Sequence, residues 1–138
     1  MNTVTYQLRL PYLHRRDGSL FPGLILDLQS PESLTPTIEI RAQLDSGAEY
    51  SLFQGGLAVA IGLDQLFVFN LANGAPLESR ILSITLSHAE LGRFNLLARF
   101  STGPLRRNIL GRDFFDLLQI GFDEHHSEVY LGNRADPN

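Results

Sequence analysis

One short run of residues places a carboxylate, a hydroxyl group and a glycine at the end of an apolar, strand-like segment. The run reads Leu44-Asp45-Ser46-Gly47-Ala48. A carboxylate in this place can act as a general base, the Ser46 hydroxyl can hydrogen-bond behind it, and Gly47 permits a sharp turn. The run occurs once in the chain, so chemistry that needs two such carboxylates requires a second copy of the protein.

The segments on both sides of this run have the periodicity of β-strands. Residues 37–40 alternate between apolar and polar types, as in a half-buried strand, and the chain resumes an apolar pattern over residues 50–53. An isolated Asp-Ser-Gly also occurs as an Asx-type turn that closes a hairpin. The order of strand, acid, tight turn and strand favours the presentation of Asp45 to a cleft.

A second segment carries two aliphatic residues and a glycine, Ile109-Leu110-Gly111, before a short amphipathic run that ends near Leu118. Together, the two segments resemble the retropepsin family, the retroviral-type aspartic proteases. That family has Asp-Thr/Ser-Gly-Ala early in the chain and an aliphatic pair followed by glycine before its only helix. The resemblance covers about residues 36–131.

The resemblance implies an all-β fold: a single-lobed, closed acid-protease barrel with one short C-terminal helix, active as a homodimer. A single domain would cover residues 1–138, with N-terminal strands and a loop in 1–35 and a tail in 132–138. The chain's 138 residues suffice for a core, and its hydrophobic content of 43% is ordinary for a globular protein.

Periodicity and the spacing of glycine and proline predict a chain rich in strands. A helical turn is expected at 57–61 and a longer helix at 111–118. The expected strands are 4–10, 22–28, 36–44, 49–53, 65–70, 77–87, 92–100, 119–123 and 127–131.

The resemblance implies an aspartic endopeptidase with the catalytic residues Asp45, Ser46 and Gly47. Two carboxylates a few ångströms apart cannot both ionise easily, so one keeps its proton while the other activates a water molecule. The two carboxylates would be those of Asp45 in two protomers. Activity is expected at acidic to mildly acidic pH, without a metal or cofactor.

The substrate is expected to be an extended peptide held in an apolar cleft. Asn73-Gly74 lies between strand-like arms and predicts a two-residue hairpin turn. The resemblance implies that this hairpin is a flap over the peptide, and an ordinary surface turn is the alternative. The predicted substrate-binding residues are Leu44, Ala48, Leu71, Ala72, Asn73, Gly74 and Leu110.

The resemblance also implies an ion pair between Glu49 and Arg112, which with Gly111 would support the cleft near the dimer contact. The alternative is that both charges are solvated and contribute almost nothing. The dimer contact is expected to join the loops at Ser46 and to include a sheet built from the chain termini, around residues 4–10 and 128–131.

Charge and composition exclude several other functions. The net charge of -4 and the lack of a long basic run give no electrostatic case for nucleic acid or an anionic membrane. The arginine doublets 15–16 and 106–107 are interpreted as loop surface. The chain has no cysteine, which excludes disulfides and thiolate catalysis. Residues 1–13 do not resemble a secretory signal, so a cytoplasmic location is expected.

Other interpretations remain open at this point. Residues 123–126, Asp-Glu-His-His, carry metal-ligating side chains, but adjacent residues of a strand point to opposite faces, which favours a polar hairpin tip. A peptide- or protein-binding module on the same fold would not cut its ligand. A structural β domain would contain the Asp45 run as an accidental turn.

Overall fold

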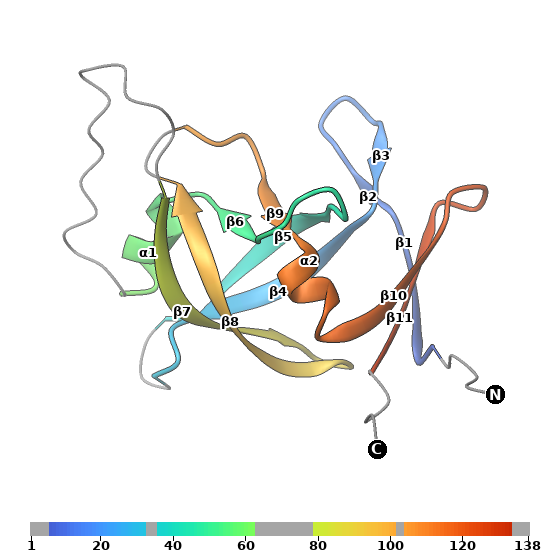
Figure 1. Ribbon diagram of the computed structural model, residues 1–138. Helices are drawn as coiled ribbons and strands as arrows, with labels where there is room; N and C mark the ends of the chain where they lie inside the picture. The colour runs from blue at the N-terminus through green and yellow to red at the C-terminus, as the bar shows by residue number, and fades with distance from the viewer. Residues whose placement is uncertain (1–5, 33–35, 63–78, 102–103, 134–138) are drawn as a thin grey trace.

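The computed structural model describes residues 6–32, 36–62, 79–101 and 104–133. These residues form a closed β-barrel with a three-stranded sheet beside it (Figure 1). Around the barrel the strands are β4 (Gly23–Gln29), β5 (Ile38–Leu44), β9 (Asn108–Leu110), β6 (Leu52–Phe53), β8 (Gly92–Ser101) and β7 (Ser79–His88). The predicted all-β, closed-barrel fold is therefore confirmed.

The barrel forms because its strands alternate between apolar and polar residues. In β5, Ile40, Ala42 and Leu44 are buried, while Glu39 and Arg41 at alternate positions face solvent. This period of two places one face of every strand in the core and leaves the other for solvent or for a site. The inward side chains of the neighbouring strands complete a single core that includes Leu26, Phe53, Ile84, Leu86, Phe100 and Leu110.

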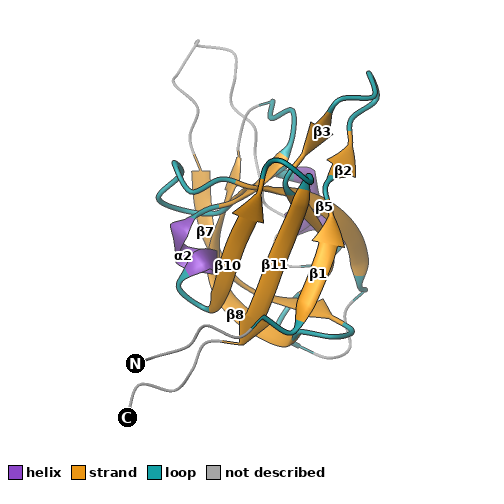
Figure 2. Ribbon diagram, turned by 90° about the vertical axis from the view of Figure 1, so that its right-hand side faces the viewer, coloured by secondary structure: helices purple, strands orange, loops and turns teal. Residues whose placement is uncertain are grey.

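A separate sheet contains both ends of the described chain. β11 (Glu128–Asn133) lies between β1 (Leu8–Pro11) and β10 (Leu118–Asp123), with antiparallel pairing on both sides (Figure 2). Leu8 lies opposite Leu131 in this register. The expected sheet of terminal strands thus exists within one chain, and its two edges are β1 and β10.

A small hairpin and two short helices complete the described chain. β2 (Leu13–His14) pairs with β3 (Leu20–Phe21), and the helices are α1 (Gly56–Ala60) and α2 (Arg112–Phe115). None of the helices of the described segments is long and apolar enough to cross a membrane.

Several sequence predictions need correction. The helix predicted for 111–118 ends at Phe115, because Leu118 is buried and already begins β10. The strand predicted for 49–53 shortens to β6, and the short strands β2, β3 and β9 were not predicted. The strand predicted for 65–70 and the Asn73-Gly74 hairpin lie outside the described residues.

Candidate active site

Asp45 directly follows the last residue of β5 and is anchored by the neighbouring strand β9. β5 and β9 run parallel, with Leu44 in register with Leu110. The backbone N–H of Asp45 donates to the carbonyl of Leu110 at 2.9 Å. The aliphatic pair before Gly111 therefore fixes the position of Asp45, although the two segments are far apart in sequence.

The Asp45 loop, residues 45–48, turns tightly around the carboxylate. Asp45 Oδ1 accepts a hydrogen bond from the N–H of Gly47 at 2.9 Å, and the N–H of Ala48 donates to the carbonyl of Asp45 at 3.1 Å. Ser46 and Gly47 are exposed. Oδ2 of Asp45 has no hydrogen-bond partner in the part of the chain that the structure describes. The carboxylate is thus held through one oxygen and leaves the other available.

Gly111 brings the start of α2 against the Asp45 loop. A Cβ atom on Gly111 would lie 2.7 Å from the carbonyl carbon and oxygen of Tyr50 and 2.8 Å from the carbonyl oxygen of Ala48. The next N–H, that of Arg112, donates to the carbonyl of Ala48 at 2.8 Å. The backbone of Gly111 is extended, so glycine is needed here for the close approach and not for an unusual φ.

A buried hydrogen-bond cluster behind the loop joins Ser51 to Asp113. The N–H of Ser51 donates to both carboxylate oxygens of Asp113, at 2.9 and 3.0 Å, and its hydroxyl donates to Oδ1 at 2.7 Å. Ser51 Oγ in turn accepts from the N–H of Gly111 at 3.0 Å. Ser51 is fully buried, so this cluster locks the return of the loop to the start of α2.

The predicted ion pair between Glu49 and Arg112 is not formed in the single chain. Both residues line a shallow hollow together with Tyr50, Asp113 and Asp116. Neither side chain has an ion-pair partner within 4.0 Å among the described residues, whereas Arg9 pairs with Glu128 and His126 with Asp123. The support predicted for this corner comes instead from the backbone of Arg112 and from the Ser51–Asp113 cluster.

Solved structures with the same arrangement identify the fold. A retropepsin-like aspartic protease from Rickettsia conorii matches with a TM-score of 0.61 and 14% identity, over 99% of this chain and 100% of that chain. The retroviral protease-like domain of Ddi1 from Leishmania major matches with a TM-score of 0.53 and 15% identity, over 83% and 95% of the two chains. This chain has the single-lobed retropepsin-like fold.

A structure of EIAV protease complexed with the inhibitor HBY-793 matches with a TM-score of 0.47 and 17% identity, over 82% of this chain and 92% of that chain. No protein-family model matches the sequence, and the comparison with curated proteins finds no match. The retropepsin-like fold rests on the likeness to the Rickettsia and Leishmania structures, at 14% and 15% identity, and not on a sequence match.

Leu44 and Leu110 were predicted to bind substrate, but both lie in the core of the barrel. Leu44 is 3% exposed and Leu110 is 0% exposed, because both side chains pack in the core. They hold the Asp45 loop from behind and do not line the surface at Asp45. Ala48 is half-buried in the loop itself. Leu71, Ala72, Asn73 and Gly74 lie outside the described residues, so their role stays a prediction.

The surface at Asp45 is a hollow of about 390 Å³, here called the Asp45 hollow. The sequence did not indicate its walls, which come mainly from the segment before β9. The residues that line it are Gln43, Asp45, Pro104, Leu105, Arg106, Arg107 and Ile109. Alternation in β5 is the one signal that could have found Gln43, since it lies two residues before Asp45 and faces the same side.

The histidine-containing segment forms the predicted polar turn between β10 and β11. His126 Nδ1 lies 2.8 Å from Asp123 Oδ2, and the hydrogen bond from the His126 side chain lowers the pKa of Asp123. No group of three or more His, Cys, Asp or Glu side chains suited to a metal ion occurs in the described segments.

Proposed function

We propose that the chain is an aspartic endopeptidase whose catalytic carboxylates are Asp45 of two protomers. The observation that carries this proposal is the Asp45 carboxylate itself, placed at the end of a barrel strand, bonded to its own loop through one oxygen and open to a hollow. The retropepsin-like fold, shared with aspartic proteases, supports the same function.

In the proposed mechanism, a water molecule lies between the two carboxylates, one ionised and one protonated. The ionised Asp45 takes a proton from the water as its oxygen attacks the scissile carbonyl carbon. The protonated Asp45 donates to the developing oxyanion, which stabilises the tetrahedral intermediate. Transfer of a proton to the leaving nitrogen then breaks the C–N bond and releases an acid and an amine.

A homodimer is part of the proposal because each chain carries one such carboxylate. A twofold axis at the exposed Ser46 and Gly47 would bring the two loops together, with the same residues on both sides of the contact. Within one chain β11 is already paired on both sides, so a partner strand would add at β1 or β10.

The test is incubation of the purified chain with a mixed peptide library, followed by mass spectrometry of the products. Cleavage is expected from the wild type and not from Asp45→Asn. Adding excess Asp45→Asn to the wild type should lower the cleavage by the wild type, because a mixed dimer has one carboxylate and one amide in place of two carboxylates. Equal cleavage by the wild type and Asp45→Asn would contradict the proposal. Peptide binding without cleavage by either protein would identify a binding module.

A further inference from the structure

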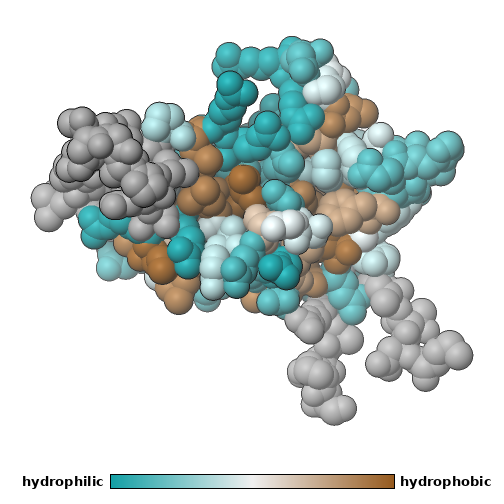
Figure 3. Space-filling view, turned by 45° about the horizontal axis from the view of Figure 1, so that its top comes forward, coloured by the Kyte–Doolittle hydropathy of each residue, from teal (hydrophilic) through white to brown (hydrophobic). Residues whose placement is uncertain are grey.

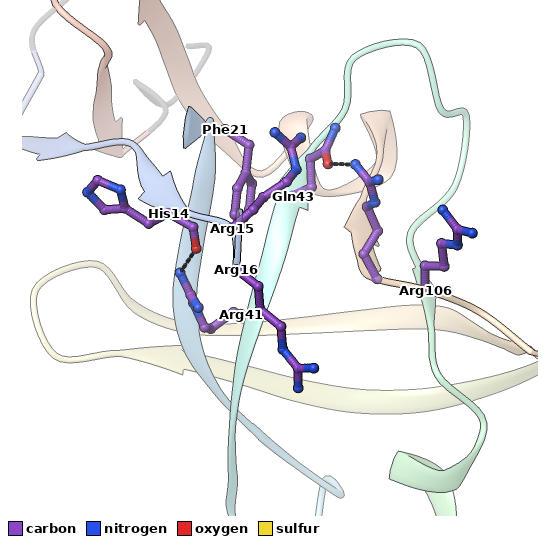
Figure 4. Close-up of a pocket in the computed structure, with 8 residues that line it drawn as sticks. His14, Arg15, Arg16, Phe21, Arg41, Gln43 and Arg106 are labelled. Atoms are coloured by element: carbon purple, nitrogen blue, oxygen red, sulfur yellow. Dashed lines mark hydrogen bonds between the residues drawn. The ribbon is translucent and has the colours of Figure 1, made fainter. Parts of the chain in front are cut away.

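Five arginines surround a second hollow that adjoins the Asp45 hollow. This arginine hollow has a volume of about 300 Å³. It brings together residues from the β2–β3 hairpin, from β5 and from the segment before β9 (Figure 4). Its arginines are Arg15, Arg16, Arg41, Arg106 and Arg107. They are five of the eleven basic residues of a chain with a net charge of -4, and none of the described residues that line the hollow is acidic.

Two of these guanidinium groups, those of Arg41 and Arg15, are held in place by neutral partners. Arg41 Nη2 donates to the carbonyl of His14 at 2.7 Å, and Arg15 Nη1 donates to the carbonyl of Leu20 at 3.2 Å. Arg15 also lies 4.9 Å from the centre of the Phe21 ring. Neutral acceptors and an aromatic face fix the positions of these charges without neutralising them.

The wall shared with the Asp45 hollow is positively charged as well. Arg107 Nη1 donates to Gln43 Oε1 at 2.5 Å, and Arg106 is exposed with no hydrogen bond or ion pair to the described chain. Asp17, the acid next to the first arginine doublet, bonds to the hydroxyl of Ser19 at 2.6 Å and does not line the hollow. No described acidic side chain lines the space between the arginines, and the charge of Asp17 acts on Arg15 from outside it.

The arginine hollow adjoins the Asp45 hollow and extends beside β5. Gln43, Arg106 and Arg107 line both hollows, so the two are continuous. Arg41 and Gln43 precede Asp45 at alternate positions, on the outward face of β5. At about 3.3 Å per strand residue, they lie roughly 13 and 7 Å from Asp45 along the strand. An extended peptide has the same rise. If it runs alongside β5 from the Asp45 hollow, a side chain two to four residues from the cut bond reaches the arginines.

We propose that the arginine hollow selects peptide substrates that carry Asp or Glu two to four residues from the cleaved bond. This inference rests on the proposed endopeptidase function. A carboxylate matches the planar fork of a guanidinium and completes charge-assisted hydrogen bonds that neutral side chains cannot make. Figure 3 shows hydrophilic side chains gathered at the top of the molecule, with hydrophobic side chains beside and below them. In a twofold dimer, each protomer supplies one such hollow, so acids are favoured on both sides of the cut.

The test uses pairs of peptides that differ only by Glu or Gln at these positions. For the wild type, kcat/KM should be about tenfold higher for the Glu peptide, and the ratio should fall towards one in Arg41→Gln and in Arg106→Gln. Arg106 makes no hydrogen bond to the described chain, so Arg106→Gln breaks none. Arg41→Gln breaks the bond to the carbonyl of His14, so the Arg106 variant separates the loss of charge from an effect on folding. Arg93→Gln is the matched control, because Arg93 is exposed on β8 and away from both hollows, and it should keep the preference.

A binding measurement separates this inference from the proposed function. Labelled Glu and Gln peptides are titrated into Asp45→Asn, with and without Arg106→Gln. Tighter binding of the Glu peptide that depends on Arg106 supports the inference, even if the wild type cuts nothing. Equal binding or equal cleavage of the two peptides overturns it and leaves the endopeptidase standing. A single-stranded oligonucleotide that displaces the Glu peptide at a concentration below that of the peptide would also overturn the inference. That result would identify the arginine hollow as a nucleic-acid site.

Discussion

Asp45 and Asp113 are the same residue type at one site, and the chain treats their carboxylates in opposite ways. Asp113 accepts hydrogen bonds from the N–H and hydroxyl of Ser51 and from the N–H of Phe114, all between 2.7 and 3.0 Å. Asp45 accepts one, from Gly47 at 2.9 Å, and borders an open hollow. The Asp113 carboxylate is fully hydrogen-bonded within its own chain. The Asp45 carboxylate keeps one oxygen without a hydrogen bond from the described chain.

This difference shows how a half-buried carboxylate with an unused oxygen can be held in place. A catalytic acid must leave lone pairs unused until substrate and water arrive, which stabilises nothing in the free protein. The bonds that hold its loop must therefore come from residues that do no chemistry. Here they come from Leu110, Gly111 and the Ser51–Asp113 cluster, all of which lie behind the Asp45 loop.

The largest expected effect is the loss of activity in Asp45→Asn. An amide cannot take a proton from water, so kcat/KM should fall by about 10³-fold or more. The free energy of unfolding should stay within about 0.5 kcal/mol of wild type, because the amide oxygen can still accept from the N–H of Gly47. Peptide cleavage and urea unfolding measure the two quantities.

Asp27→Asn is the matched control for this change. Asp27 is exposed on β4, within the barrel but away from the Asp45 hollow. Its variant should keep both activity and stability. A similar loss of activity in Asp27→Asn would show that the assay reports general damage and not the chemistry of Asp45.

The second effect is a loss of stability in Asp113→Ala. Removal of this carboxylate leaves the buried N–H and hydroxyl of Ser51 without their acceptor, which should cost about 3 kcal/mol of unfolding free energy. Asp113→Asn keeps one acceptor oxygen and should lose less. Urea unfolding measures both free energies. An alanine variant as stable as wild type would contradict the structural role assigned to Asp113.

The features of the site that are formed by residues close together in the sequence could be predicted. The Asp45 run and the glycine after the aliphatic pair carried the resemblance that implied the barrel, and the order of strand, acid and tight turn predicted an acid presented to a cleft. Contacts between distant segments could not be predicted in this way. Asp113 lies in the first turn of α2, and nothing in the local sequence shows that Ser51 lies against it. The arginine doublets were interpreted as loop surface, and their common hollow with Arg41 exists only after folding.

The third effect concerns the close approach behind the Asp45 loop. In Gly111→Ala, the new methyl group would overlap the backbone of Tyr50 and Ala48, and the loop must shift to relieve it. We expect a loss of about 2 kcal/mol in unfolding free energy and a reduced kcat. Gly56→Ala is the control, since nothing lies within 4 Å of a Cβ at that helical position. Alanine there should be neutral or stabilising by up to about 1 kcal/mol.

The smallest effect is expected at Asp123. Unlike Asp45 and Asp113, this acid accepts hydrogen bonds from a residue of its own turn, His126. The hydrogen bond from the His126 side chain, followed by that from the His126 N–H, lowers the pKa of Asp123 below its ordinary 3.8. A lowered pKa in the folded state stabilises the protein above the unfolded pKa, and this contribution is lost as the pH falls through the folded pKa. Asp123→Asn should therefore lower the Tm slightly at pH 6, and the gap should close below pH 4. Thermal unfolding from pH 6 to pH 3 tests this, and a gap that widens as the pH falls would contradict the assigned direction.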